Sequence, residues 1–174
     1  DPRKRPAADG RVRCIAVTRL IERKGVRDLL RAWSLLERGR YSLEIVGGGP
    51  EAAKLRAIAA QSGIESEIHF VGPLSREEVA ARCRRADMFV LAPYEEAFGN
   101  VFAEAIATGL PVVGSEIGAI PDLVRNGENG VRVQPGDPDP PAPPHPPPGE
   151  GPPRPEPHPR RHPRSRSNRL PDPP

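Results

Sequence analysis

The distribution of proline limits which part of this chain can fold. The sequence contains 25 prolines, and seventeen of them lie at Pro138 or beyond, among arginine, histidine and glycine. Proline donates no backbone hydrogen bond, and a segment with so few apolar side chains cannot bury enough surface to offset its loss of conformational entropy. We therefore expect a disordered, proline-rich tail at 138–174, a polar linker at 1–11 and one folded domain at 12–137.

The proline-rich tail has more than one possible explanation. Segments of this composition bind SH3 or WW domains, whereas truncation or translation in a shifted frame would produce the same composition with no binding role. The chain starts at Asp1 rather than at a methionine and shows no signal peptide. It has the character of a fragment of a longer protein.

Residues 12–137 alternate between short apolar runs, which predict strands, and segments with apolar residues at helical spacing. Ser75 with Glu78 is a capping box that starts one helix, and Gly109 followed by Pro111 ends another. The expected strands are 12–17, 41–46, 67–71, 87–92, 112–113 and 131–133, and the expected helices are 26–37, 51–61, 75–85, 98–109 and a short one after Gly118.

This alternation predicts the fold class. Strands that are apolar along most of their length are typical of a parallel sheet covered on both faces. We therefore predict an α/β fold, a doubly wound, Rossmann-like parallel six-strand sheet in a single domain, with strand order 3-2-1-4-5-6.

Charge and cysteine content argue against several classes of protein. The net charge of +3 comes from the two ends of the chain, since residues 14–136 carry one more acidic than basic side chain, and nucleic-acid binding needs a clustered basic face. Cys14 and Cys83 lie in different predicted elements, which favours buried thiols in a reducing compartment over a disulfide. No Cys/His cluster indicates a metal site, and no apolar run approaches the ~20 residues that span a membrane.

Residues 94–115 carry the most informative pattern, which is a polar loop, a helix, a glycine stop and a short strand. Val101, Glu104 and Ala105 fall on one helix face, so we expect Glu104 to be buried there. A buried carboxylate needs hydrogen-bond donors from a protein partner or from a polyhydroxylated ligand. Glu96 precedes the helix, and eight residues of helix would place it ~12 Å from Glu104.

Two carboxylates so far apart suit the two ends of an extended ligand, with the free N–H groups of the helix start between them. A nucleotide sugar has this layout, since its sugar and its ribose are hydroxylated and a diphosphate joins them. The alternative is structural: an acidic residue that favours the helix dipole, together with a Glu104 that is paired locally.

From Glu96 the sequence reads E-A-F-G-N-V-F-A-E-A-I-A-T-G-L-P-V-V. This frame resembles the signature of the retaining, two-domain (GT-B type) glycosyltransferases of family 4, also called group 1. The resemblance covers about residues 12–137 and implies a C-terminal, donor-binding domain, in which Glu104 binds the ribose hydroxyls and Glu96 the donor sugar. It also implies that the donor lies against the main chain of Phe98, Gly99, Asn100 and Val101.

Arg19 and Lys24 follow the first predicted strand, at the edge where doubly wound sheets bind ligands. A solvated basic loop is the plain alternative. The resemblance implies that both cations bind the donor diphosphate, so that together with Glu96 they form the catalytic group. Cations and helix N–H groups can stabilise the charge on a leaving diphosphate without a metal.

The turn at 47–50 reads Gly-Gly-Gly-Pro and follows the second predicted strand. Such a turn could begin a nicotinamide-cofactor site, but the third glycine of G-x-G-x-x-G would fall at Ala52. A tight turn without a ligand is the other alternative. The resemblance places Gly48 and Gly49 beside the donor pocket, and it places the nucleobase against the main chain of Val71 and Gly72. The family usually has a second glycine where this chain has Ala119.

These features predict the nucleotide-sugar-binding half of a retaining glycosyltransferase, with no metal and no cofactor. The expected partners are a nucleotide sugar and an N-terminal acceptor domain that this sequence lacks, with no nucleic acid. The expected location is cytoplasmic, with contact to the inner face of the membrane only through the parent protein. The rival hypothesis is a non-catalytic nucleotide-binding module or an inactive fragment, and a dehydrogenase domain is disfavoured because its glycine fingerprint is missing.

Overall fold

The computed structural model describes residues 10–137. The predictions for most of the linker and for the tail at 138–174 lie outside these residues. Six parallel strands form one sheet in the order β3-β2-β1-β4-β5-β6, which confirms the predicted fold class and topology. The strands are β1 Val12–Val17, β2 Tyr41–Val46, β3 Ile68–Gly72, β4 Met88–Leu91, β5 Val112–Ser115 and β6 Gly130–Val133.

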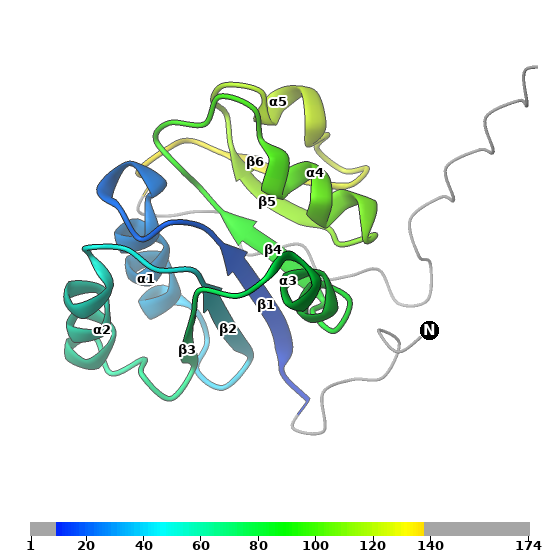
Figure 1. Cartoon of the computed structure of the whole chain (residues 1–174). Coiled ribbons are helices and arrows are strands. Elements are labelled where there is room, and N and C mark those ends of the chain that lie inside the picture. Colours follow the sequence, from blue (N-terminus) through cyan, green and yellow to red (C-terminus); the bar gives the residue numbers. More distant parts are fainter. Residues whose placement is uncertain (1–9, 138–174) are drawn as a thin grey trace, which may run out of the picture.

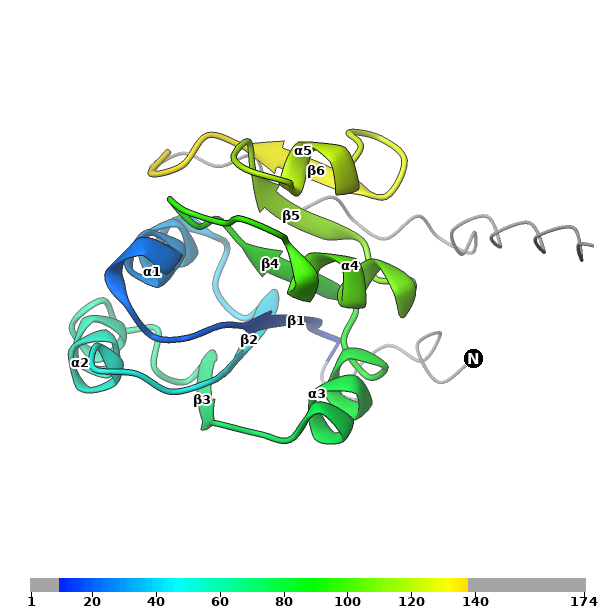
Figure 2. The same ribbon diagram turned by 45° about the horizontal axis from the view of Figure 1, so that its top comes forward.

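Helices cover both faces of this sheet. Figures 1 and 2 show α1 and α2 together on one face, and α3, α4 and α5 on the other. The bounds are α1 Val26–Leu35, α2 Ala52–Gln61, α3 Arg76–Cys83, α4 Asn100–Ala107 and α5 Ile120–Leu123, with a short 3-10 turn η2 at Glu22–Lys24. Within residues 10–137 none of these helices is long and apolar enough to cross a bilayer.

The strand register brings the loops of the site to one edge of the sheet. β1 pairs with β2 along its whole length, so that Val17 lies opposite Val46. On its other side β1 pairs with β4, where Ile15 lies opposite Phe89. The loops that leave the carboxyl ends of β1, β2 and β4 therefore start at nearly the same level, which is the edge where doubly wound folds bind ligands.

The core lies between the sheet and its helical layers. The middle of β1 is fully covered, and Phe89 of β4 packs edge-to-face on Phe102 of α4 with ring centroids 5.3 Å apart. Both of these aromatic side chains have no exposed surface. Aromatic pairs in this geometry add to the stabilisation from burial, so α4 is fixed firmly on β4.

Most predicted boundaries lie within two residues of the observed ones. The Ser75 side chain accepts from the Glu78 N–H, and the Glu78 carboxylate accepts from the Ser75 N–H, which confirms the capping box. Gly109 follows α4 with φ of 77°, a conformation that glycine adopts without strain. Cys14 and Cys83 are free and buried, as predicted.

Candidate functional site

The loops that follow β1 and β4 are joined by main-chain contacts. The N–H of Tyr94 donates to the carbonyl of Arg23 over 2.8 Å. Gly25 follows η2 with φ of 69°, and a Cβ at this position would lie 2.3 Å from the carbonyl oxygen of Ala92. Only glycine permits so close an approach, so this glycine fixes the distance between the two loops.

Lys24 and Glu96 meet between these loops. Lys24 Nζ lies 2.8 Å from Glu96 Oε2, and the two side chains are only 19% and 14% exposed. The other oxygen of Glu96 accepts from the Gly99 N–H over 3.1 Å. Burial alone would raise the pKa of Glu96, but the hydrogen bonds from Lys24 and from the main chain of Gly99, together with the Lys24 charge, hold this pKa below its usual value.

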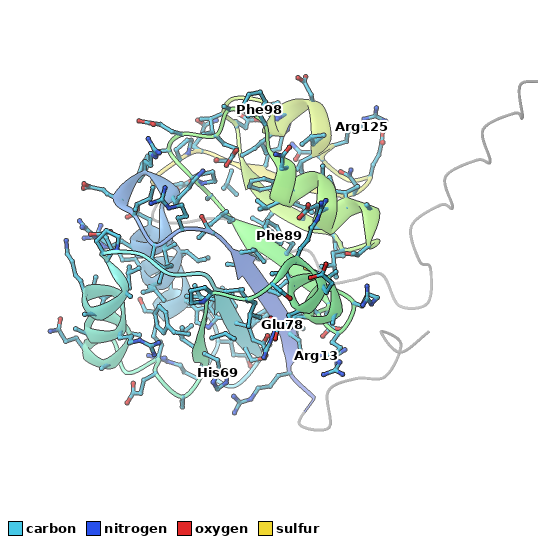
Figure 3. All side chains as sticks on the ribbon, in the orientation of Figure 1. Arg13, His69, Glu78, Phe89, Phe98 and Arg125 are labelled. Carbon is cyan, nitrogen blue, oxygen red and sulfur yellow. The ribbon has the colours of Figure 1, made fainter. Side chains whose placement is uncertain are left out.

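The start of α4 adjoins this ion pair. Gly99 is the residue before the helix, with φ of 67°, and no side chain caps the first turn. The first N–H groups of an α-helix have no partner within the helix, and together they favour anions. Phe98 precedes this turn with 78% of its surface exposed, and Figure 3 shows it at the outer edge of the loop.

Glu104 is not buried, so the prediction of its burial is wrong. Its side chain is 46% exposed and pairs with Arg76 of α3, with Oε1 2.9 Å from Nη2. The inward face of α4 is formed by Phe102 and Ala105, whereas Val101 is only partly covered. Glu104 therefore takes its hydrogen bond from a protein partner, which is the first of the two options considered, and it stands at the surface where a ligand could also reach it.

Arg19 lies two residues beyond β1 and is exposed. Its side chain has no hydrogen-bonding or charged partner among residues 10–137. It therefore differs from Lys24, whose charge is balanced by Glu96.

The glycine-rich turn is shaped by the loop after β1. A Cβ at Gly47 would lie 1.8 Å from the carbonyl oxygen of Thr18, and one at Gly49 would lie 2.4 Å from that of Leu20. These contacts account for both glycines without a ligand, as the tight-turn alternative requires. At the end of β3 the carbonyl of Gly72 accepts from the Gly47 N–H over 2.9 Å, so this part of the main chain is already bonded within the sheet.

Two contacts at the site were not anticipated from the sequence. The Tyr94 hydroxyl donates to the carboxylate of Asp28 on α1, and this hydrogen bond raises the pKa of Tyr94. In addition, a Cβ at Gly118 would lie 1.7 Å from the carbonyl oxygen of Glu96. The loop that carries Glu96 is thus held by α1 and by the loop after β5. No local sequence pattern could have linked positions this far apart, although Gly118 itself signalled a turn.

A hollow in the described residues lies away from these loops. It has a volume of about 460 Å³ and lies under α3, beside the first halves of β1, β2 and β3. Figure 3 shows Arg13, Glu78 and His69 at this lower end of the sheet, opposite Phe98. Among the arginines that line it, Arg13 pairs with Asp87 and Arg82 pairs with Glu44. No predicted site residue lines this cavity.

Among residues 10–137 there is no group of three or more histidine, cysteine, aspartate or glutamate side chains that could hold a metal ion. The predicted residues that the structure brings together are Glu96, Lys24 and the main chain at the start of α4. Gly48 lies beside Pro73, in the loop after β3, and Gly49 lies beside Leu20, in the loop after β1. Glu104 lies further along α4, next to α3.

Comparison with known proteins identifies the family. The model for the family described as Glycosyl transferases group 1 matches residues 1–141. A D-inositol 3-phosphate glycosyltransferase of Corynebacterium efficiens is 38% identical over a 130-residue alignment, which covers 70% of this chain and 31% of that protein. A GDP-mannose-dependent alpha-(1-6)-phosphatidylinositol monomannoside mannosyltransferase of Mycobacterium tuberculosis is 32% identical over a 140-residue alignment, which covers 75% of this chain and 36% of that protein.

Solved structures agree with this relationship. The Anabaena protein HepE, in complex with UDP and glucose, superimposes with a TM-score of 0.69 and 25% identity over 75% of this chain and 37% of that one. The chain thus spans about a third of the length of the proteins it matches. Since the family model matches most of the sequence, this chain belongs to the group 1 glycosyltransferase family.

Proposed function

We propose that this chain is the donor-binding half of a retaining glycosyltransferase, which transfers a sugar from a nucleoside diphosphate sugar to an acceptor. The observation that carries the proposal is the meeting of Lys24, Glu96 and the uncapped start of α4 at the carboxyl edge of the sheet. A cation, a carboxylate and free N–H groups are the groups that a diphosphate and a sugar require. The relatives support it, because one is described as GDP-mannose-dependent and another was solved with UDP and glucose.

Each part of the donor has a proposed partner. Arg19 and Lys24 bind the diphosphate, and Glu96 accepts hydrogen bonds from the sugar hydroxyls. Glu104 binds the ribose hydroxyls, for which its exposed bond to Arg76 must open; exposed ion pairs contribute little to stability, so this exchange costs little. The remaining contacts are made by the main chain of Gly48, Gly49, Val71, Gly72, Phe98, Gly99, Asn100 and Val101.

The chemistry proposed for this half is charge stabilisation. When the bond between the sugar and the diphosphate breaks, negative charge grows on the leaving phosphate. The guanidinium of Arg19, the ammonium of Lys24 and the N–H groups at the start of α4 all favour that charge. No metal and no cofactor takes part in this scheme.

The acceptor is proposed to bind against a second domain. Transfer requires the acceptor to be held against the sugar carbon in a cleft from which water is excluded. The chain spans about a third of its relatives' length, and it contributes one wall of that cleft. We therefore expect residues 1–174 alone to bind a nucleotide sugar without transferring it.

Isothermal titration calorimetry with UDP, GDP, UDP-glucose and GDP-mannose tests the proposal and identifies the base. At least one diphosphate and its sugar should bind, and the affinity should be the same with and without EDTA. If none of the four binds, the chain is a scaffold that has lost its ligand. A strict requirement for Mg²⁺ would contradict the proposed metal-free charge stabilisation.

A further inference from the structure

The two charged side chains assigned to different parts of the donor are bonded to each other. Lys24 Nζ lies 2.8 Å from Glu96 Oε2, and both side chains are largely shielded from water. The same ammonium also lies 3.4 Å from the carbonyl oxygen of Glu95. An ammonium has three donors, so the main-chain carbonyl and the carboxylate together occupy two of them.

The ion pair between Lys24 and Glu96 changes the net charge that an incoming phosphate encounters at Lys24. The Lys24 charge is balanced by Glu96, whereas the exposed Arg19 has no partner among residues 10–137. A diphosphate that approaches Lys24 must come close to the carboxylate of Glu96, which cannot move away easily because its other oxygen accepts from the Gly99 N–H. Like charges in a shielded site repel each other with little screening by salt.

A donor that still carries its sugar can form a favourable contact with Glu96. Sugar hydroxyls can donate to the free lone pairs of the Glu96 carboxylate, and hydrogen bonds to an ionised acceptor are about twice as strong as neutral ones. The spent nucleoside diphosphate has no such hydroxyl at this position. Its terminal phosphate comes close to the ionised carboxylate of Glu96 and donates no hydrogen bond to it.

We infer that Glu96 makes the site selective for the intact nucleotide sugar over the spent nucleoside diphosphate, by holding Lys24 in an ion pair that only a sugar-bearing donor compensates. The inference rests on the proposed function, since it assumes that the diphosphate and the sugar bind at Lys24 and Glu96. It adds a consequence for turnover, because a site of this kind releases its product more readily than it would with a neutral residue at position 96.

A purely structural role for Glu96 makes a different prediction. If the carboxylate only braced the loop through Gly99, its removal would loosen the loop and weaken both ligands in the same direction. Glu96→Gln keeps an oxygen that can accept from the Gly99 N–H but removes the negative charge. The two roles can therefore be separated by the direction in which the two affinities change.

The test compares UDP with UDP-glucose, and GDP with GDP-mannose, by calorimetric titration of the full chain. For Glu96→Gln we expect the diphosphate to bind roughly three- to tenfold more tightly and the nucleotide sugar to bind several-fold more weakly. Glu95→Gln is the matched control, because it removes the same charge from the neighbouring residue, whose side chain is 70% exposed and lies 3.6 Å from Arg23 instead. It should change neither affinity by more than about twofold.

A second variant keeps the test decisive if Glu96→Gln does not fold, as judged by its thermal melt. Glu96→Asp retains the charge but shortens its reach, so it should weaken the nucleotide sugar and leave the diphosphate no tighter. Parallel weakening of both ligands in Glu96→Gln, or no change in either, overturns the inference while leaving the proposed function intact. Failure of the unmodified chain to bind any of the four ligands overturns both.

Discussion

Glu96 is held ionised by its neighbours, and this couples its protonation to stability. Its pKa is lowered in the folded chain from an ordinary value of 4.5, against the effect of burial, by Lys24 and the main chain of Gly99. A carboxyl group whose pKa falls on folding stabilises the fold above its unfolded pKa, and this contribution is lost as pH falls through the folded pKa.

We therefore expect the difference in unfolding free energy between the unmodified chain and Glu96→Gln to be constant from neutral pH to about pH 5. It should then shrink as the pH falls below 4.5. Urea titrations at a series of pH values measure it. A difference that grows towards acid pH would mean that Glu96 is protonated more easily in the fold than in the unfolded chain.

Arg19 and Lys24 should contribute to binding of the diphosphate group and not to binding of the nucleoside. Either substitution by alanine should weaken nucleoside diphosphate binding by about 1.5–3 kcal/mol, the scale of a hydrogen bond to a charged group. The matching nucleoside, uridine or guanosine, should bind almost unchanged. Calorimetry with both ligands checks this, and equal losses for the nucleoside and the diphosphate would remove the two cations from the proposed site.

The loop that carries Glu96 is positioned by close backbone packing. Gly118 has φ of 53°, and an added Cβ would lie 1.7 Å from the carbonyl oxygen of Glu96. Gly127 also has a positive φ, 80°, but an added Cβ would meet nothing within 4 Å. The two glycines therefore separate the cost of the conformation from the cost of the clash.

Gly127→Ala should cost roughly 1–2 kcal/mol of stability, the usual penalty for a left-handed residue with a side chain. Gly118→Ala should cost more, about 3 kcal/mol or above, because backbone must also move. Denaturant titration measures both. Equal losses would show that the loop after β5 can move away from Glu96 at no cost and does not position it.

The exposure of Glu104 shows what helical spacing alone leaves undecided. Helical spacing groups residues on a common face, but it does not say which face turns inward. On α4 the large Phe102, packed on Phe89, sets the inward direction, and this turns Glu104 towards Arg76 and the surface. The short length of α4, eight residues, leaves too few turns for the pattern to identify its own buried side.

The topology of the sheet could be predicted from the sequence because the local signals agreed. Apolar strands, the Ser75 capping box and the glycine stop at Gly109 each pointed to the same α/β order. The bond from Tyr94 to Asp28 and the packing of Gly118 on Glu96 join segments distant in sequence. Such contacts are set by the folded sheet, so no local pattern predicts them.

Amide chemical shifts can show, residue by residue, whether a nucleotide sugar binds at the carboxyl edge of the sheet. UDP-glucose and GDP-mannose are each added to ¹⁵N-labelled chain. We expect the shifts to concentrate in the loops after β1 and β2, at residues 19–25 and 47–49, and in the loop after β4 with the first half of α4, at residues 96–104. Shifts that gather instead around Arg13, Glu44 and Arg82, which line the cavity under α3, would contradict it.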